Sequence, residues 1–474
     1  MFKKYLIFLC CFFLFNQANA NGVSPYLPLN TDPLIELQIE RLASITQMPI
    51  LSKPYHIVTV VKYLKKIRTS HPTLYNRLNN YIKRYKQQSA ITHFSTKIGH
   101  SNKETGSLDN NRGIAIDSTF QTSIAGFHQF NKYAIANFGG ALVDKAKIIP
   151  YNTYFSFGYE YLQVDLGYRE HWLSPLQESA SLLSTNAKPA LSMTLSNVKP
   201  ITSWNAKYEF SIGQLEEMDG IHFDGATSSG KPGFLTMQLS FQPFDWWTIG
   251  GNRTFMFAGG NREIDLKTIG KAIVDPISGD NCGGDSNLQN CDLESGNQIA
   301  SITSKFDFSI NSFPLSLLIE YAGEDAKNYQ YSLGNIGRTY GFFIPYLTEK
   351  TSLYGEFTEF HQRWYVHHLY DEGYANDQTV MGHWWGNHKA MDDLSAGNAS
   401  TIRFNWDFQD AYHLQVKLRS AFIEPSTNYQ SHRTNDVEIK LKQVYKKGFL
   451  NYSVNIGKDL QNESYYRIAL GYNW

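Results

Sequence analysis

Apolar and polar residues alternate with a period of two over much of the chain from about residue 113 to its end. In the last nine residues, the apolar side chains all fall on one face of an extended strand: Tyr466, Ile468, Leu470, Tyr472 and Trp474. The same alternation recurs at 155–161, 402–408, 414–419 and 450–456. Such strands fit lipid on one side and water on the other, and the buried face of a soluble sandwich would seldom be so aromatic. The pattern predicts an all-β transmembrane barrel.

The length of the alternating region limits the number of strands. About 365 residues, at roughly 20 residues for each strand with its connection, predict 16 or 18 antiparallel strands, and we expect about 18. A barrel this wide has an aqueous lumen unless something fills it. Long segments with weak periodicity are predicted to be outer loops or lumen plugs: 265–298, 328–345 and 361–398.

Residues 1–20 have the pattern of a signal peptide. Two lysines precede an apolar run over 5–15, and Ala18-Asn19-Ala20 supplies the small residues of a cleavage site. The apolar run is too short to span a bilayer. We therefore expect an exported protein.

Between the signal peptide and the strands, the period changes to that of helices. Pro33 can begin a first helix, a second fits 56–67, and a third begins near Pro72 with apolar residues at helical spacing. We predict a small periplasmic helical bundle over 21–100, followed by the barrel over 101–474.

This helical region is strongly basic, with no Asp or Glu between Glu40 and Glu104. Its cations are either the solvated faces of amphipathic helices, or they contact anionic lipid headgroups on the inner membrane surface or an acidic polymer in the periplasm. The candidate anion-contacting residues are Lys62, Lys65, Lys66, Arg68, Arg77, Lys83 and Arg84.

Composition narrows the possible partners. Aromatic residues make up 15% of the chain and charged residues 18%, and the formal net charge of zero argues against nucleic-acid binding. After removal of the signal peptide, Cys282 and Cys291 remain, and in an oxidising compartment we expect a disulfide between them. Their spacing is poor for a metal, and the histidines at 367, 368, 383 and 388 match no recognised motif, so no metal or cofactor is predicted.

Several segments, in order along the chain, are similar to segments of a known family. They are Tyr-Leu-Pro-Leu-Asn-Thr-Asp-Pro-Leu at 26–34 and its continuation to 42, Gly-Tyr-Arg-Glu-His-Trp-Leu-Ser-Pro at 167–175, Ser-Leu-Leu-Ser-Thr-Asn-Ala-Lys-Pro at 181–189, Phe-Gln-Pro at 241–243, Ile-Gly-Gly-Asn-Arg at 249–253, Gly-Gly at 259–260, Ala-Gly-Glu-Asp at 322–325 and Gly-His at 382–383. Together they resemble the Wzi family of outer-membrane capsule assembly proteins. That family's Trp-Trp-Gly-Pro-Gly run appears here as His-Trp-Leu-Ser-Pro at 171–175.

The resemblance implies an outer-membrane barrel of eighteen strands with a periplasmic helical bundle. It implies a lectin without catalytic activity that helps to hold capsular polysaccharide on the surface of a Gram-negative cell. The expected partners are capsular or other surface polysaccharide and outer-membrane lipid, and the protein is expected to be a monomer.

Sugar binding requires aromatic faces, planar polar groups and, for an acidic glycan, Arg or Lys. Two stretches and the segments of the resemblance provide such residues, and the candidates are Arg169, Trp172, Asn186, Lys188, Arg253, Glu324, Asp325, Trp364, His383, Trp384 and Trp385. The alternative is that the tryptophans belong to membrane-interface girdles and the charged residues to salt bridges in the lumen.

Two other functions are compatible with an exported barrel. An outer-membrane diffusion channel would have a lumen free of loops. A surface hydrolase is poorly supported, because Gly284-Asp285-Ser286 lies in a predicted loop without a strained turn to activate the serine. Glu324 and Asp325 are adjacent, which on a strand turns their carboxyl groups to opposite faces.

Overall fold

The computed structural model describes residues 22–29, 33–103, 108–114, 118–144, 147–265, 267, 269–270, 296–311, 313–324, 334–389, 394–409, 411–426 and 430–474. The predicted signal peptide over 1–20, the Cys282–Cys291 disulfide, Gly284-Asp285-Ser286 and Asp325 lie outside these residues.

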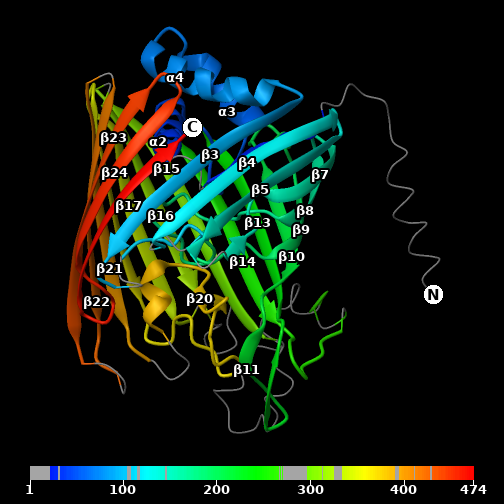
Figure 1. The fold of residues 1–474 in the computed structure, drawn as a ribbon. Coiled ribbons are helices and arrows are strands. Elements are labelled where there is room, and N and C mark those ends of the chain that lie inside the picture. Colours follow the sequence, from blue (N-terminus) through cyan, green and yellow to red (C-terminus); the bar gives the residue numbers. More distant parts are fainter. Residues whose placement is uncertain are drawn as a thin grey trace, which may run out of the picture.

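Antiparallel strands close into a barrel, as the alternation predicted (Figure 1). In chain order they are β3 (Ser89–Ser101), β4 (Phe120–Asn131), β5 (Ala134–Val143), β6 (Lys147–Ile149), β7 (Thr153–Tyr159), β8 (Leu162–Tyr168), β9 (Leu191–Ser196), β10 (Lys207–Gln214), β13 (Gly233–Phe244), β14 (Trp247–Phe257), β15 (Asn297–Ile310), β16 (Phe313–Gly323), β17 (Ile336–Thr348), β18 (Thr351–Phe360), β21 (Gly397–Gln409), β22 (Tyr412–Ile423), β23 (His432–Tyr445), β24 (Gly448–Lys458) and β25 (Ser464–Asn473). β6 and β7 both pair with β5, so the described residues form a wall of 18 strand positions. β25 pairs with β3 and closes the wall.

The two faces of the wall differ as expected for a membrane barrel. In β25 the outward Ile468 and Leu470 are 54% and 50% exposed, whereas the inward Arg467 and Ala469 are 5% and 6% exposed. Exposed aliphatic and aromatic side chains continue around the outer face of the other strands. A continuous apolar surface of this extent fits contact with lipid.

The two ends of the barrel also differ. Short turns join the strands at the end where the helices and the C-terminus lie, and the long connections lie at the opposite end (Figure 1). In bacterial outer-membrane barrels the short turns face the periplasm and the long loops face outwards. We therefore call these ends the periplasmic and extracellular ends.

No helix among the described residues is both long enough and apolar enough to cross a bilayer.

The helical region lies within and across the periplasmic end. It comprises α2 (Pro33–Thr46), α3 (Ile57–Leu64), η2 (Lys65–Ile67), α4 (Pro72–Ile82) and η3 (Lys83–Lys86), with a two-stranded pairing of β1 (Tyr26–Leu27) and β2 (Tyr55–His56). The helices predicted to begin at Pro33 and Pro72 are confirmed. α2 lies inside the wall, where Arg41 pairs with Asp407 of β21 at 3.0 Å and Ser44 bonds Ser316 of β16 at 2.7 Å.

Two details of the predicted boundaries differ from the structure. The first barrel strand begins at Ser89, before the predicted boundary at residue 101. A bulge between Ile91 and His93 interrupts its period of two, which weakens the strand pattern in the sequence. The alternation that begins at about residue 113 does not mark a strand start at Ile114, which is buried at a turn, and the next described strand, β4, begins at Phe120.

Two long loops from the extracellular end fill the lumen. We call residues 169–190, between β8 and β9, the inner loop, and residues 361–389, after β18, the aromatic loop. Their apolar side chains form a buried cluster with inward residues of the wall. The aromatic loop contains β19 (Ala375–Asn376), β20 (Thr379–Val380) and η6 (Trp384–His388), and a hairpin of β11 (Met218–Phe223) and β12 (Ala226–Gly230) also lies at this end (Figure 1). The segment 361–398, predicted to be an outer loop or a lumen plug, lies in the lumen over its described residues 361–389, and β21 begins at Gly397. The segment 328–345, predicted in the same way, includes most of β17.

Candidate functional site

The inner loop passes through the lumen as buried, irregular backbone that is anchored by the wall. Buried Glu320 of β16 accepts hydrogen bonds from Ser174 Oγ at 3.0 Å and from the Ser181 amide at 3.1 Å. Glu356 of β18 accepts from the Glu178 amide at 3.4 Å. Wall carboxylates thus satisfy the polar groups that a buried loop would otherwise leave unpaired.

Trp172 links this loop to the N-terminal segment. Its side chain is 1% exposed, and its indole N–H donates to the Leu176 carbonyl at 3.1 Å. Lys53 and Trp172 exchange two backbone hydrogen bonds of 3.0 Å, and the Lys53 ammonium lies 5.1 Å from the ring centre. The cation–π contact and the backbone pairing fix the indole in place.

Arg169 is equally enclosed. Its guanidinium pairs with Glu209 at 2.6 Å and with Asp165 at 3.6 Å, and it lies 4.2 Å from the centre of the Tyr26 ring. Only 1% of the residue is exposed. These contacts hold the wall, the inner loop and the N-terminal segment together.

Asn186 and Lys188 lie further along the inner loop, where it meets the aromatic loop. Asn186 Nδ2 donates to the Val380 carbonyl at 2.8 Å and is 1% exposed. Lys188 pairs with Glu216 at 3.2 Å and with Asp377 at 3.1 Å, and Asp377 also pairs with Lys147 at 3.0 Å. We call Lys147, Lys188, Glu216 and Asp377 the outer clasp, because these partly exposed residues join separate segments at the extracellular end.

The aromatic loop brings four predicted residues into one cluster. Trp364, Trp384 and Trp385 are at most 2% exposed, and the Trp385 ring stacks on Phe360 at 5.0 Å. His383 caps η6 by accepting the Trp385 amide N–H at Nδ1, 3.0 Å away. Burial lowers the pKa of His383 to about 3, which keeps the imidazole neutral and able to accept this bond.

Tyr365, which sequence reasoning missed, joins the two loops. Its hydroxyl donates to the Ser181 carbonyl at 2.6 Å and accepts from the His383 amide at 2.7 Å. Glu324 accepts from the Tyr365 amide at 3.1 Å, so this predicted residue fixes the aromatic loop. The sequence does not distinguish an aromatic residue that joins two loops from one that contacts a glycan.

Arg253 lies apart from the other candidates. It alternates in β14 with the buried, inward Asn252 and Thr254, and therefore points to the outer face, where it bonds Gln298 of β15. The structure thus brings together Glu324 and the aromatic-loop residues, places Arg169 and Trp172 elsewhere in the lumen, and leaves Lys188 at the outer clasp. The role of these residues in glycan binding stays a prediction.

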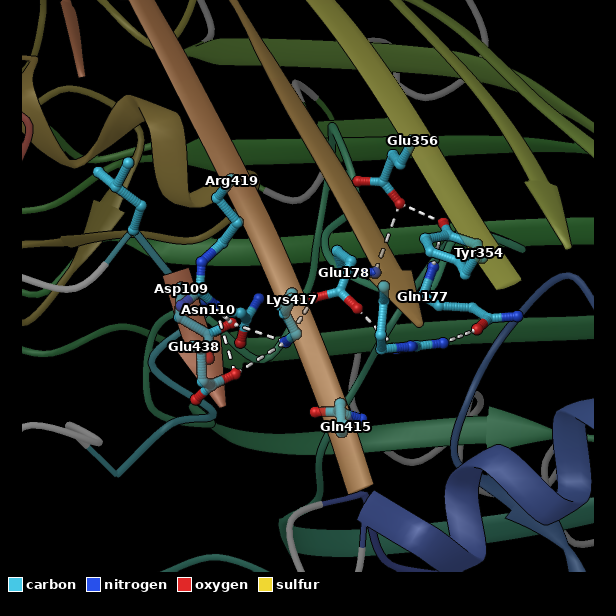
Figure 2. Close-up of polar contacts among 12 residues, drawn as sticks. Asp109, Asn110, Gln177, Glu178, Tyr354, Glu356, Gln415, Lys417, Arg419 and Glu438 are labelled. Carbon is cyan, nitrogen blue, oxygen red and sulfur yellow. Dashed lines mark hydrogen bonds and ion pairs between the residues drawn. The ribbon is translucent and has the colours of Figure 1, made fainter. Parts of the chain in front are cut away.

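A network of buried ion pairs, also missed from the sequence, joins the inner loop to β22 and β23 (Figure 2). Lys417 lies 2.8 Å from Glu178, 3.5 Å from Asp109 and 3.6 Å from Glu438. Arg419 lies 3.0 Å from Asp109. Burial favours the neutral acid, but Lys417 and a neighbouring arginine hold the pKa of Glu178 below its usual range. The polar face of β22 was visible in the sequence, whereas its loop partners were not.

The seven candidate anion-contacting residues of the helices divide into two groups. Arg77 pairs with Asp407 at 3.2 Å, and Arg84 donates to the Thr92 carbonyl at 2.7 Å, so both are structural. The remaining five are exposed: Lys62, Lys65, Lys66, Arg68 and Lys83. Among the described residues, no group of three or more His, Cys, Asp or Glu side chains is arranged to hold a metal ion.

Comparison with known proteins gives a family match and several similar solved structures. The family model described as "Capsule assembly protein Wzi" matches residues 83–466. The chain is also similar to a solved structure of Escherichia coli Wzi, described as an outer membrane protein involved in group 1 capsule assembly and as a carbohydrate-binding β-barrel. The identity is 14% and the TM-score 0.69, over 94% of this chain and 98% of that one.

Two other solved barrels are more distant. OccD3 of Pseudomonas aeruginosa has a TM-score of 0.48 and 8% identity over 82% of this chain and 91% of that chain. OccAB4 of Acinetobacter baumannii has a TM-score of 0.45 and 11% identity over 81% of this chain and 96% of that chain. No curated protein matches the sequence.

Proposed function

This chain belongs to the Wzi family of capsule assembly proteins, and we propose that it binds surface polysaccharide at the outer membrane and helps to attach or assemble a capsule. The apolar outer wall supports residence in a membrane, and the short periplasmic turns support the orientation given above. Carbohydrate binding by the Escherichia coli protein of the same fold supports the choice of ligand.

The filled lumen is the observation that favours polysaccharide binding over the function of a diffusion channel. The inner loop and the aromatic loop pack against each other through Tyr365 and against the wall through Glu320 and Glu356. A channel requires a continuous aqueous path, and a packed apolar cluster across the lumen opposes one. A binder, in contrast, gains a rigid extracellular surface from the same packing.

We place the polysaccharide contact at the extracellular end around the outer clasp. The side chain of Lys147 is 58% exposed and that of Lys188 is 18% exposed, and both form ion pairs with Asp377. Cations held in place by an acidic partner can bind acidic sugar groups without first losing much side-chain freedom. This role requires no catalytic step, and we propose a non-enzymatic function.

A second contact is proposed at the periplasmic end. The helices α3 and α4 lie across the mouth of the barrel (Figure 1), and Lys62, Lys65, Lys66, Arg68 and Lys83 of the helical region are exposed. This position favours an acidic polymer in the periplasm over lipid headgroups beside the outer wall.

The test is a deletion strain in which polysaccharide is measured in cell-bound and shed fractions. Loss of the protein should move polysaccharide into the medium, and restored wild-type protein should return it to the cells. Lys147→Gln with Lys188→Gln should lower retention, while Lys350→Gln, an exposed lysine at a periplasmic turn, serves as the matched control. Unchanged retention in the deletion strain, together with steady ion conductance of the purified protein in planar bilayers, would favour the channel.

A further inference from the structure

A cavity of about 240 Å³ lies in the lumen beside α2, towards the periplasmic end. The wall strands β21–β25 and β3 form one side of it, and α2 forms the other. The inner loop contributes Gln177, and the segment 108–114 contributes Asp109 and Arg112. The cavity therefore touches parts of the chain that enter the barrel from both ends.

Basic side chains outnumber acidic ones among the described residues that line this cavity. The acidic residues already have partners: Glu36 pairs with Arg112 at 3.0 Å, and Glu40 with Lys53 at 2.8 Å. Glu438 pairs with Lys440 at 2.6 Å. The cavity is thus positively charged and favours an anion.

Amide side chains form the second part of the lining. Each offers a donor and an acceptor in one plane, which matches the paired donor and acceptor character of sugar hydroxyl groups. They are Gln121, Gln177, Gln415, Asn451, Asn455 and Asn473.

Arg403 is a further cation of the lining. It lines the cavity and is 8% exposed, its Nη1 lies 2.6 Å from Glu178, and its Nη2 bonds Gln177. Its buried Nε has no hydrogen-bond partner among the described residues. This nitrogen has almost no accessible surface, so Arg403 contributes positive charge to the cavity and not a free hydrogen-bond donor.

The cavity extends to the periplasmic end. Its lining includes Asn473, next to the C-terminal residue, and Pro33 at the start of α2. The C-terminus lies at the end where the helices cross the mouth (Figure 1). Lys97, Gln415 and Asn473 keep partial exposure, so solvent reaches the cavity.

We infer that this cavity binds an acidic sugar of the uronic acid class from the periplasmic side, with Lys and Arg holding the carboxylate and the amides holding the hydroxyls. At about 30 Å³ for each water, the volume corresponds to about eight waters, which suits one sugar ring and not a polymer. His413 is the only aromatic ring among the described lining residues, so a neutral sugar has little stacking surface and should bind weakly. This internal site is separate from the proposed surface contact at the outer clasp.

The experiment is a calorimetric titration of the purified, detergent-solubilised full-length protein with glucuronate, glucose and inorganic phosphate. We expect glucuronate to bind at least tenfold more tightly than either of the others. The double variant Lys97→Gln/Lys440→Gln removes two cations of the cavity and should weaken glucuronate binding at least tenfold. The control Lys350→Gln/Lys446→Gln changes two exposed lysines at periplasmic turns, outside the cavity, and should keep wild-type affinity.

Heat-modifiable migration on gels shows whether each variant is folded. If the double variant fails to fold, Gln415→Leu replaces it and should weaken binding about threefold. Absence of glucuronate binding, equal binding of glucose or phosphate, or full affinity in the folded cavity variant would overturn the inference. Because the deletion strain measures attachment on cells and the titration measures this cavity, each proposal can fail while the other stands.

Discussion

Replacement of Arg419 by methionine tests the ion-pair network most directly. The guanidinium is fully buried and forms two bonds with Asp436, at 2.7 Å and 3.0 Å, and an ion pair with Asp109 at 3.0 Å. Methionine matches the unbranched, flexible stem of arginine over its first four heavy atoms, so the packing of the stem is kept. The change therefore removes the charge while largely preserving the packing.

The expected loss of stability follows from the groups that remain. Removal of one partner from a buried ion pair costs about 3–5 kcal/mol, because the other charge stays buried without compensation. Here Asp436 keeps bonds from the Tyr465 hydroxyl and the Leu108 amide, and Asp109 keeps Lys417 at 3.5 Å. These remaining contacts place the expected loss at the lower end, about 3 kcal/mol.

The assay is equilibrium unfolding in urea of the barrel in lipid vesicles, followed by tryptophan fluorescence. The control is Arg433→Met, an exposed arginine of β23 whose loss should change the unfolding free energy by less than about 0.5 kcal/mol. Arg419→Met and Asp436→Asn remove the same interaction. The unfolding free energy lost by the double variant should therefore be smaller than the sum of the losses of the two single variants. An Arg419→Met barrel as stable as the wild type would refute the reasoning.

Four further perturbations test other parts of the structure. Burial raises the pKa of Glu170 to about 7, so the folded state holds a proton that the unfolded state releases near pH 4.3. The unfolding free energy should therefore fall as the pH rises from about 4.3 to 7. Parallel curves of unfolding free energy against pH for the wild type and Glu170→Gln would contradict this. Tyr365→Phe loses the bond to the Ser181 carbonyl and should lower the unfolding free energy by about 1–3 kcal/mol in the same urea assay. Removal of residues 366–389 should produce ion conductance in planar bilayers that the wild type lacks, and a barrel that stays closed would show that other segments suffice. Charge reversal of three exposed residues of the helical region, by Lys65→Glu, Lys66→Glu and Arg68→Glu, should weaken binding of an acidic polymer without loss of heat-modifiable migration on gels. Loss of that migration would indicate a structural role for these residues.

Features set by local periodicity could be predicted from the sequence. The alternation in β25 identified its lipid and lumen faces, and chain length limited the strand number to 16 or 18, because each strand requires a narrow range of residues. Pro33 and Pro72 marked helix starts, since their fixed φ suits a first turn. The position of α2 inside the lumen could not be predicted, because its partners, such as Asp407, are far away in the sequence.

The candidate site was harder to predict for a physical reason. A tryptophan in a loop can stack on a sugar or fill a core, and both roles require the same large apolar face. Trp364 and Trp385 are buried by contacts from the other loop, which local sequence does not encode. The outward direction of Arg253 could be predicted from the sequence, because an even number of residues separates it from Ile249 in β14 and both therefore lie on the same face of the strand. Buried Asn252 lies on the opposite face.

The pairing of β25 with β3 sets an order on how the molecule is built. These strands are the last and the first of the wall, so the ring cannot be sealed until the whole chain has been synthesised. α2 precedes β3, and both loops lie between β3 and β25, yet all three end up enclosed. We therefore expect the nascent sheet to take up these segments before the seam closes. We expect that a chain whose seam closed early would become a hollow, misassembled ring, which makes the timing of closure a folding requirement in its own right.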